Sequence, residues 1–100
     1  MTKRQQLDEL ATNNEVEIIV ADGFDAALIG TADFFCFEER VSKTHALYDA
    51  AKCIQCLMDN DGMDETEAQE FFDYNVAGAV IRGGPIFINV LHAQTDQDSA

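Results

Sequence analysis

The chain has 100 residues, of which 47% are hydrophobic and seven are phenylalanine, a composition that supports one domain with a modest core and excludes intrinsic disorder. Nineteen Asp and Glu residues against six Lys and Arg give a formal net charge of −13, which excludes direct DNA or RNA binding by the chain alone. This charge favours basic partners. The alternative is that the charge only keeps a small protein in solution.

Cysteine usage and hydropathy bear on where the protein resides. Cys36, Cys53 and Cys56 form an odd set, and residues 3–6 (KRQQ) are not followed by the apolar run of a secretory signal. No stretch approaches the ~18 apolar residues that a membrane helix needs. We therefore expect a soluble protein of the cytoplasm, with no membrane partner.

The first third of the chain predicts a peripheral segment followed by a β-hairpin. Residues 1–14 are polar, with a few apolar residues at helical spacing, so we expect a loosely packed short helix or a frayed arm. Residues 16–21 (VEIIVA) favour a strand, and the DG dipeptide after them suits a type I′ turn into a second strand at residues 25–31. A helical turn over residues 24–30 is the alternative.

Two further strands are expected before the helices. Residues 34–37 (FFCF) form an aromatic cluster that, as a strand, buries Phe35 and Phe37 together and turns Phe34 to the opposite face. An exposed Phe34 would indicate a contact surface, although packing in the core or under a lid is commoner for such a residue. Residues 41–48 carry β-formers and end just before a helix begins.

Residues 49–81 predict two amphipathic helices joined at residues 61–64 (DGMD). Asp49 is suited to cap the first helix, and Gly62 accepts the left-handed conformation that ends it. Asp64 is suited to cap the second, with a glutamate three residues on, as in a capping box. The second helix places an apolar stripe on one side, made of Ala68, Phe71, Phe72, Val76 and Ala79.

Asn75 falls inside that stripe, where an unpaired amide would cost ~1–3 kcal/mol, so we expect it to have structural or ligand partners. Residues 82–85 then predict a turn, and residues 86–91 (IFINVL) predict a central strand because both of its faces are largely apolar. The elements together predict the α+β class. A small antiparallel or mixed sheet of about four strands packs against a two-helix hairpin in a single domain over residues 1–100. Residues 1–14 and 93–100 are expected to be peripheral or disordered.

The patterns that could carry chemistry are weak. Cys53 and Cys56 have CxxC spacing, but they lie within a predicted helix and no second Cys or His pair completes a site, so we interpret them as small hydrophobes. His45 and His92 lack a nearby Ser or carboxylate in sequence, so no catalytic triad is indicated. The glycine pair at residues 83–84 precedes a strand and reads as a turn. We expect no catalytic residue and no cofactor.

Residues 59–62 (DNDG) resemble part of a calcium loop. The EF-hand register fails, because it would place Leu57 and Ala68 at the first and twelfth ligand positions. The alternative to capping and solvation is a weak divalent-cation site at three nearby aspartates, Asp59, Asp61 and Asp64.

The distribution of charged residues is the clearest functional pattern in the sequence. No basic residue occurs between Lys52 and Arg82, whereas seven acids do, namely Asp59, Asp61, Asp64, Glu65, Glu67, Glu70 and Asp73. Glu67, Glu70 and Asp73 repeat every third residue, about 4.5 Å apart along a helix. Such a row is able to imitate a phosphate backbone and to occupy the nucleic-acid channel of a basic protein; a solvated helix face is the alternative.

The run GMDETEAQEFFDYNVAGA at residues 62–79, with GGPIF at residues 83–87, resembles a group of small uncharacterised proteins of tailed phages and bacteria. Their shared pattern is GM-x-x-x-EA, two aromatics, NVAGA and a PIF strand. With weaker likeness upstream, the resemblance covers roughly residues 16–91. It implies a shared fold and a phage setting, and it transfers no catalytic residue. Such proteins often have an aromatic before the glycine where this chain has AVIRG at residues 79–83.

Three hypotheses follow. The first is a small acidic, non-enzymatic interaction protein that binds a basic protein through an acidic helix face, as an inhibitor or modulator that resembles nucleic acid. Its candidate contact residues are Asp64, Glu67, Glu70, Asp73 and Phe34. The second is a structural or oligomeric module in which Phe34 and the helical hairpin make a self-contact. The third is a weak metal-binding protein around residues 59–64 or the cysteines.

Overall fold

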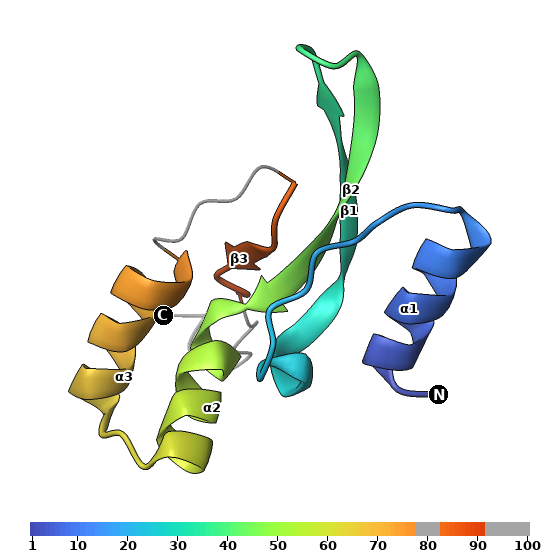
Figure 1. Ribbon diagram of the computed structural model, residues 1–100. Helices are drawn as coiled ribbons and strands as arrows, with labels where there is room; N and C mark the ends of the chain where they lie inside the picture. Colours follow the sequence, from blue (N-terminus) through green and yellow to red (C-terminus); the bar gives the residue numbers. More distant parts are fainter. Residues whose placement is uncertain (78–82, 92–100) are drawn as a thin grey trace, which may run out of the picture.

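The computed structural model describes residues 1–77 and 83–91 (Figure 1). Its elements in chain order are α1 Lys3–Asn13, the 3₁₀ turn η1 Asp25–Ala27, β1 Leu28–Cys36, β2 Val41–Asp49, α2 Ala50–Asp61, α3 Glu65–Phe71, the π-helical segment η2 Phe72–Ala77 and β3 Ile86–Ile88. Helix α1 packs beside β1, whereas α2 packs on α3 and against β2 (Figure 1).

The sheet is mixed and has the order β1-β2-β3. β1 and β2 pair antiparallel, from Leu28 opposite Tyr48 to Cys36 opposite Val41. β3 runs parallel to β2 and pairs with residues 47–49. The α+β class and the mixed sheet are confirmed, but the described residues form three strands instead of about four, and three α-helices instead of a two-helix hairpin alone.

Both ends of α2 and the start of α3 fall where the sequence predicts them, whereas α3 ends at Phe71 and passes into η2. Asp49 is the last residue of β2 and also the cap of α2, because its Oδ1 accepts from the amides two and three residues on, at 3.0 and 3.3 Å. Gly62 ends α2 in the left-handed conformation, with φ at 70°. Asp64 Oδ1 then accepts from the amide of Glu67 at 2.8 Å and begins α3.

Tyr48 occupies the centre of the core. Its fully buried ring lies 5.6 Å from the ring of Phe87, which in turn meets Phe72 edge-on at 5.2 Å. The Tyr48 hydroxyl accepts a hydrogen bond from the amide of Ala21 at 2.9 Å, which fastens the segment between α1 and η1 to the sheet. The other buried apolar residues of the described chain are Leu7, Phe24, Ala27, Leu28, Ala46, Cys53, Leu57 and Ala68.

The prediction of a hairpin at residues 16–31 is wrong. Residues 16–21 belong to no strand, and Ile18 and Val20 instead pack against the core. The DG turn leads into η1, in line with the helical alternative for this stretch. β1 pairs with β2 because the short turn at residues 37–40 joins them directly, and the pairing extends over nearly the whole of both strands, with an irregularity at Ile29.

β3 is an edge strand, which corrects the prediction of a central strand at residues 86–91. The centre of the described sheet is β2. Phe87 packs against the core, while Ile86 and Ile88 are half-buried. Apolar side chains on both faces show that a strand is covered above and below, but they carry no information on whether another strand lies along each edge.

The aromatic cluster is exposed, contrary to the prediction that Phe35 and Phe37 are buried. Their exposed fractions are 52% and 84%, and their rings meet edge-on at 5.0 Å. Both lie at the far end of the β1–β2 hairpin, which projects beyond the other elements (Figure 1). The strand alternates as expected, but alternation does not say which part of a strand lies over the core.

Asn75 is exposed in η2, so the expectation that it lies inside the apolar stripe is wrong. A π-helix has more residues per turn than an α-helix, and a 100° step therefore misplaces residues beyond Phe72. Ala68 and Phe72 are buried and Val76 is half-buried, so the side that faces the core keeps a four-residue spacing. Ala79 lies outside the described residues.

The N-terminal segment is a packed helix, the first of the two expectations for residues 1–14. Thr2 and Gln5 form a capping box, in which the Thr2 hydroxyl accepts from the Gln5 amide at 3.1 Å and the Thr2 amide donates to the Gln5 side chain at 2.8 Å. Leu7 is buried in the core. The tail at residues 93–100, expected to be disordered, lies outside the described residues.

Removing the Tyr48 hydroxyl tests its role in the core. Tyr48→Phe should lower the free energy of unfolding by about 1–2 kcal/mol, because the Ala21 amide loses its acceptor. Urea denaturation followed by circular dichroism measures the change. Tyr74→Phe is the control, since Tyr74 is 86% exposed. Equal stability of Tyr48→Phe and the wild-type protein would contradict this role.

The left-handed end of α2 gives a second test. Gly62→Ala should destabilise the protein by about 1–2 kcal/mol, because an L-residue is strained at φ 70°. Gly30→Ala is the matched control, since an added Cβ there meets no atom within 4 Å and the backbone has no positive φ. Thermal unfolding of both variants should show a loss for Gly62→Ala alone; equal losses would count against the cap.

Candidate functional site

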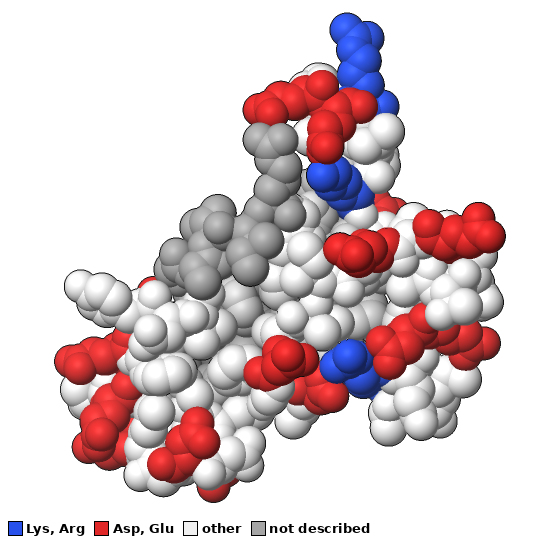
Figure 2. Space-filling model, in the orientation of Figure 1, with Lys and Arg blue, Asp and Glu red and all other residues white. Residues whose placement is uncertain are grey.

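Seven acidic residues gather on the part of the molecule formed by the end of α2, by α3 and by the start of η2. Figure 2 shows acidic side chains spread over α2 and α3. Every member of the set is exposed. We call this set the acidic helical surface; it consists of Asp59, Asp61, Asp64, Glu65, Glu67, Glu70 and Asp73.

The ion pairs of the described residues lie elsewhere. Arg4 pairs with Asp8 and with Asp25, each at 3.1 Å, and Lys43 pairs with Glu39. None of them includes a member of the acidic helical surface. The carboxylates of this surface therefore repel one another, and no ion pair within the described residues offsets the repulsion.

Three members of the surface have hydrogen bonds within their own helices. Asp64 caps α3, Asp59 accepts from the Gln55 amide group at 2.8 Å, and Asp73 accepts from the Gln69 amide group at 3.0 Å. The cap gives Asp64 a structural role whatever else it does, worth about 1 kcal/mol. Glu67 and Glu70 are different, because they border a hollow.

This hollow has a volume of about 360 Å³ and is shallow and open to solvent. Two carboxylates and two aromatic rings lie around it, with Phe71 39% and Tyr74 86% exposed. A cation that enters it meets negative charge together with ring faces, the combination that favours a guanidinium group. The lining residues are Met63, Glu67, Glu70, Phe71, Tyr74 and Asn75.

The sequence prediction missed the two aromatics of the hollow. The sequence pattern places Phe71 in the apolar stripe that faces the core. A partial signal is present in the sequence, because Glu67, Glu70 and Phe71 follow the spacing i, i+3, i+4 within α3. Tyr74 lies in η2, where α-helical spacing does not apply. Of the candidate contact residues, Asp64 caps α3, Glu67 and Glu70 lie on α3, and Asp73 lies at the start of η2.

Phe34 is not part of this surface. It lies on β1, in the projecting half of the β-hairpin, whereas α3 lies on the other side of the molecule (Figure 1). Its ring is 51% exposed and meets the ring of His45 at 5.3 Å. The candidate contact residues thus fall on two separate surfaces.

The CxxC pair is built into α2 as packing. Cys53 is fully buried and Cys56 is half-buried, and both are free thiols. Burial, aided by the neighbouring Cys56, raises the pKa of the Cys53 thiol to about 12, and burial also raises the pKa of Cys56. Redox-active thiols need the opposite shift, so the arrangement supports the interpretation as small hydrophobes.

His45 has a structural partner. Its Nδ1 lies 2.9 Å from the carbonyl oxygen of Gly84, and since a carbonyl oxygen only accepts, Nδ1 carries the proton. The bond ties the turn before β3 to β2. Across residues 1–77 and 83–91, no three His, Cys, Asp or Glu side chains are placed to hold a metal ion. His92 lies outside the described residues.

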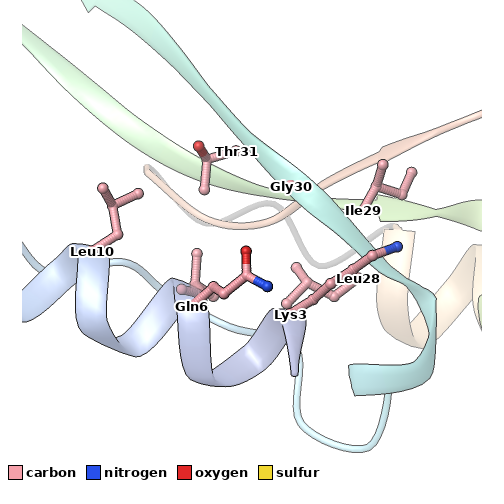
Figure 3. Close-up of a pocket in the computed structure, with 8 residues that line it drawn as sticks. Lys3, Gln6, Leu10, Leu28, Ile29, Gly30 and Thr31 are labelled. Atoms are coloured by element: carbon pink, nitrogen blue, oxygen red, sulfur yellow. The ribbon is translucent and has the colours of Figure 1, made fainter. Parts of the chain in front are cut away.

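A second hollow, of about 250 Å³, lies between α1 and β1 (Figure 3). We call it the α1–β1 groove. Its lining includes no carboxylate, thiol or imidazole, and its ionisable side chain is that of Lys3. It suits an apolar side chain. The lining residues are Lys3, Gln6, Leu7, Leu10, Leu28, Ile29, Gly30 and Thr31.

Comparison with protein-family models, with curated proteins and with solved structures found no match to the chain. The resemblance to small phage and bacterial proteins therefore stays a prediction. Among the helices of the described residues, none combines the length and apolar character needed to cross a membrane. The case for function accordingly depends on the charges, hollows and exposed aromatics of the chain itself.

The raised pKa of Cys53 predicts a loss of stability in alkaline solution. Its folded value of about 12 exceeds the ordinary value of 9.0, so the thiol's contribution is complete below pH 9 and is lost as the pH rises toward 12. From pH 9 to 10.5 the free energy of unfolding should fall with a slope that rises from about half of the limiting value toward about 1.4 kcal/mol per pH unit from this group. Cys53→Ala should show a shallower slope than Cys36→Ala in urea titrations; equal slopes would contradict the assignment.

Proposed function

We propose that this chain is a small, non-enzymatic interaction protein that binds a basic protein through the acidic helical surface. The observation that supports this most directly is the set of seven exposed carboxylates, none of which has an ion-pair partner within the described residues. Lysine or arginine side chains of a partner would relieve their mutual repulsion and would be steered to the surface from a distance.

The hollow beside Glu67 and Glu70 gives this surface a point of specificity. Phe71 and Tyr74 offer ring faces next to the carboxylates, so an arginine of the partner gains stacking in addition to charge. Glu67, Glu70 and Asp73 form a row with the repeat of one helix side. A row of this kind is suited to a protein whose own ligand is nucleic acid, and the chain would then act as its inhibitor or modulator.

The resemblance of residues 16–91 to small proteins of tailed phages and bacteria supports a phage origin and action in the cytoplasm of a bacterial host. An acidic phage protein of this size would have a basic host or phage protein as its target. The second candidate, an oligomeric module, is favoured by a different observation, the exposed aromatics of the β-hairpin.

Charge reversal on α3 and η2 tests the proposal. Glu67→Lys/Glu70→Lys/Asp73→Lys changes the net charge by +6, from −13 to −7, and should weaken binding at least about 100-fold. Asp64 is left in place because it caps α3. The partner is captured from host lysate on the immobilised protein, identified by mass spectrometry, purified, and titrated by calorimetry at two salt concentrations.

The matched control is Glu9→Lys/Glu17→Lys/Asp22→Lys, which makes the same charge change at three exposed acids outside the surface. It should bind within a few fold of the wild-type protein. Equal losses in both triple variants would show that net charge alone governs binding, and unchanged binding by the first variant would refute the proposal. Competition by duplex DNA for the purified partner tests the imitation of nucleic acid.

A further inference from the structure

The end of the β1–β2 hairpin, residues 33–41, projects from the molecule, and we call it the arm (Figure 1). Phe34 and Val41, 51% and 49% exposed, point to one face, and Phe35 and Phe37 to the other. An aromatic side chain buries ~150–250 Å², so the arm leaves on the order of 400 Å² of apolar surface in water. A patch of that size typically marks an interface.

The outer edge of β1 is open along the arm. In the described sheet β1 pairs with β2 alone, and α1 lies beside residues 28–31 of β1 (Figure 3). The free stretch of this edge is therefore residues 32–36, with Phe34 at its midpoint. β1 contains neither lysine nor proline, the residues that commonly block an edge, and a third strand would stabilise a two-stranded ribbon that is marginal alone.

The net charge near this edge is low enough for a second copy of the chain to pair there. The whole chain carries −13, but residues 28–43 carry three acids and two bases, a net charge of −1. Two copies therefore approach here without the repulsion that their helical surfaces exert. Antiparallel pairing centred on Phe34 also places Asp33 opposite Phe35 of the second copy, so that no two aspartates face each other.

The same register places Phe37 beside a binding groove. Phe37 lies opposite Thr31 of the second copy, at the α1–β1 groove of that copy (Figure 3). Phe37 is 84% exposed in the single chain. A dry apolar cavity of ~150 Å³ suffices to bind benzene, and the groove is about 250 Å³, so it has room for a phenyl ring. Two-fold symmetry fills both grooves in one step.

From this geometry we propose that the protein is a two-fold symmetric dimer in which the two β1 strands pair antiparallel about Phe34. The two three-stranded sheets become one sheet of six strands. The dimer does not depend on the binding of a basic protein. It leaves both acidic helical surfaces free, because α3 lies away from the arm (Figure 1).

Sedimentation equilibrium from about 1 μM to about 1 mM tests the dimer, a range that spans the affinity of a small interface. The mass should rise from 11.1 kDa to twice that value. Phe34→Lys sets two positive charges against each other on the symmetry axis and should weaken association at least about 100-fold. Tyr74→Lys adds the same charge at an exposed aromatic of η2 and should change the dimer dissociation constant less than about threefold.

Circular dichroism and thermal unfolding confirm that both variants are folded. A wild-type protein that stays monomeric over the whole range overturns the proposal. Equal weakening by the two variants overturns it as well, because the effect would then come from net charge and not from the arm.

The register has its own test. Ala32 lies opposite Cys36 of the second copy in the proposed pairing, whereas within one chain the two are four residues apart, ~13 Å along the strand and too far for a disulfide. Oxidised Ala32→Cys should therefore run as a covalent dimer on non-reducing gels, with residues 32 and 36 linked in peptide mapping. Wild-type protein and Ala32→Cys/Cys36→Ser are the controls. A dimer in sedimentation without this cross-link would place the contact elsewhere and overturn the proposal.

Discussion

The hydrogen bond from the Ala21 amide to the Tyr48 hydroxyl joins parts of the chain that share no secondary structure. It holds an extended segment against the central strand, and this segment brings Ile18 and Val20 to the core. The Tyr48 ring meets Phe87 of β3, and through it Phe72 of the helical layer. Loops, strands and helices thus converge on one side chain. Its burial is tolerated because the hydroxyl has a partner, as a buried phenol requires.

The helices were predictable and the strand pairing was not, for a physical reason. Helix ends depend on contacts within four residues, and Asp49, Gly62 and Asp64 act as caps whatever the rest of the chain does. Strand pairing depends on competition between distant segments. Residues 16–21 have the composition of a strand, but β2 offers β1 a longer partner, and the segment is held instead by core packing of Ile18 and Val20 and by the Tyr48 hydroxyl. No pattern local to residues 16–21 reports that outcome.

The candidate surface was partly predictable. Acidic residues in the sequence are almost always exposed, so the row on α3 follows from composition and helical spacing alone. The hollow beside it depends on which aromatics the core takes. Phe72 is buried in the core, whereas its neighbour Phe71 lies at the edge of the core and is partly exposed. The wider turns of η2, which begins at Phe72, increase this difference. For Phe34, the alternation of side chains along a strand predicts which face of β1 it lies on. Its exposure depends instead on how far β1 extends past the helices.

The parallel pairing of β2 and β3 also bears on how the chain folds. It joins residues 47–49 to residues 86–88, so everything from α2 to the end of η2 lies inside the closed loop. A loop of that length has a large entropy cost, which falls if α2 and α3 form first and shorten the span. Closing this loop brings Phe87 into contact with Tyr48 and Phe72. Changes to the caps of α2 and α3 would thereby alter the rate at which the sheet is completed, although these residues lie outside the sheet's interior.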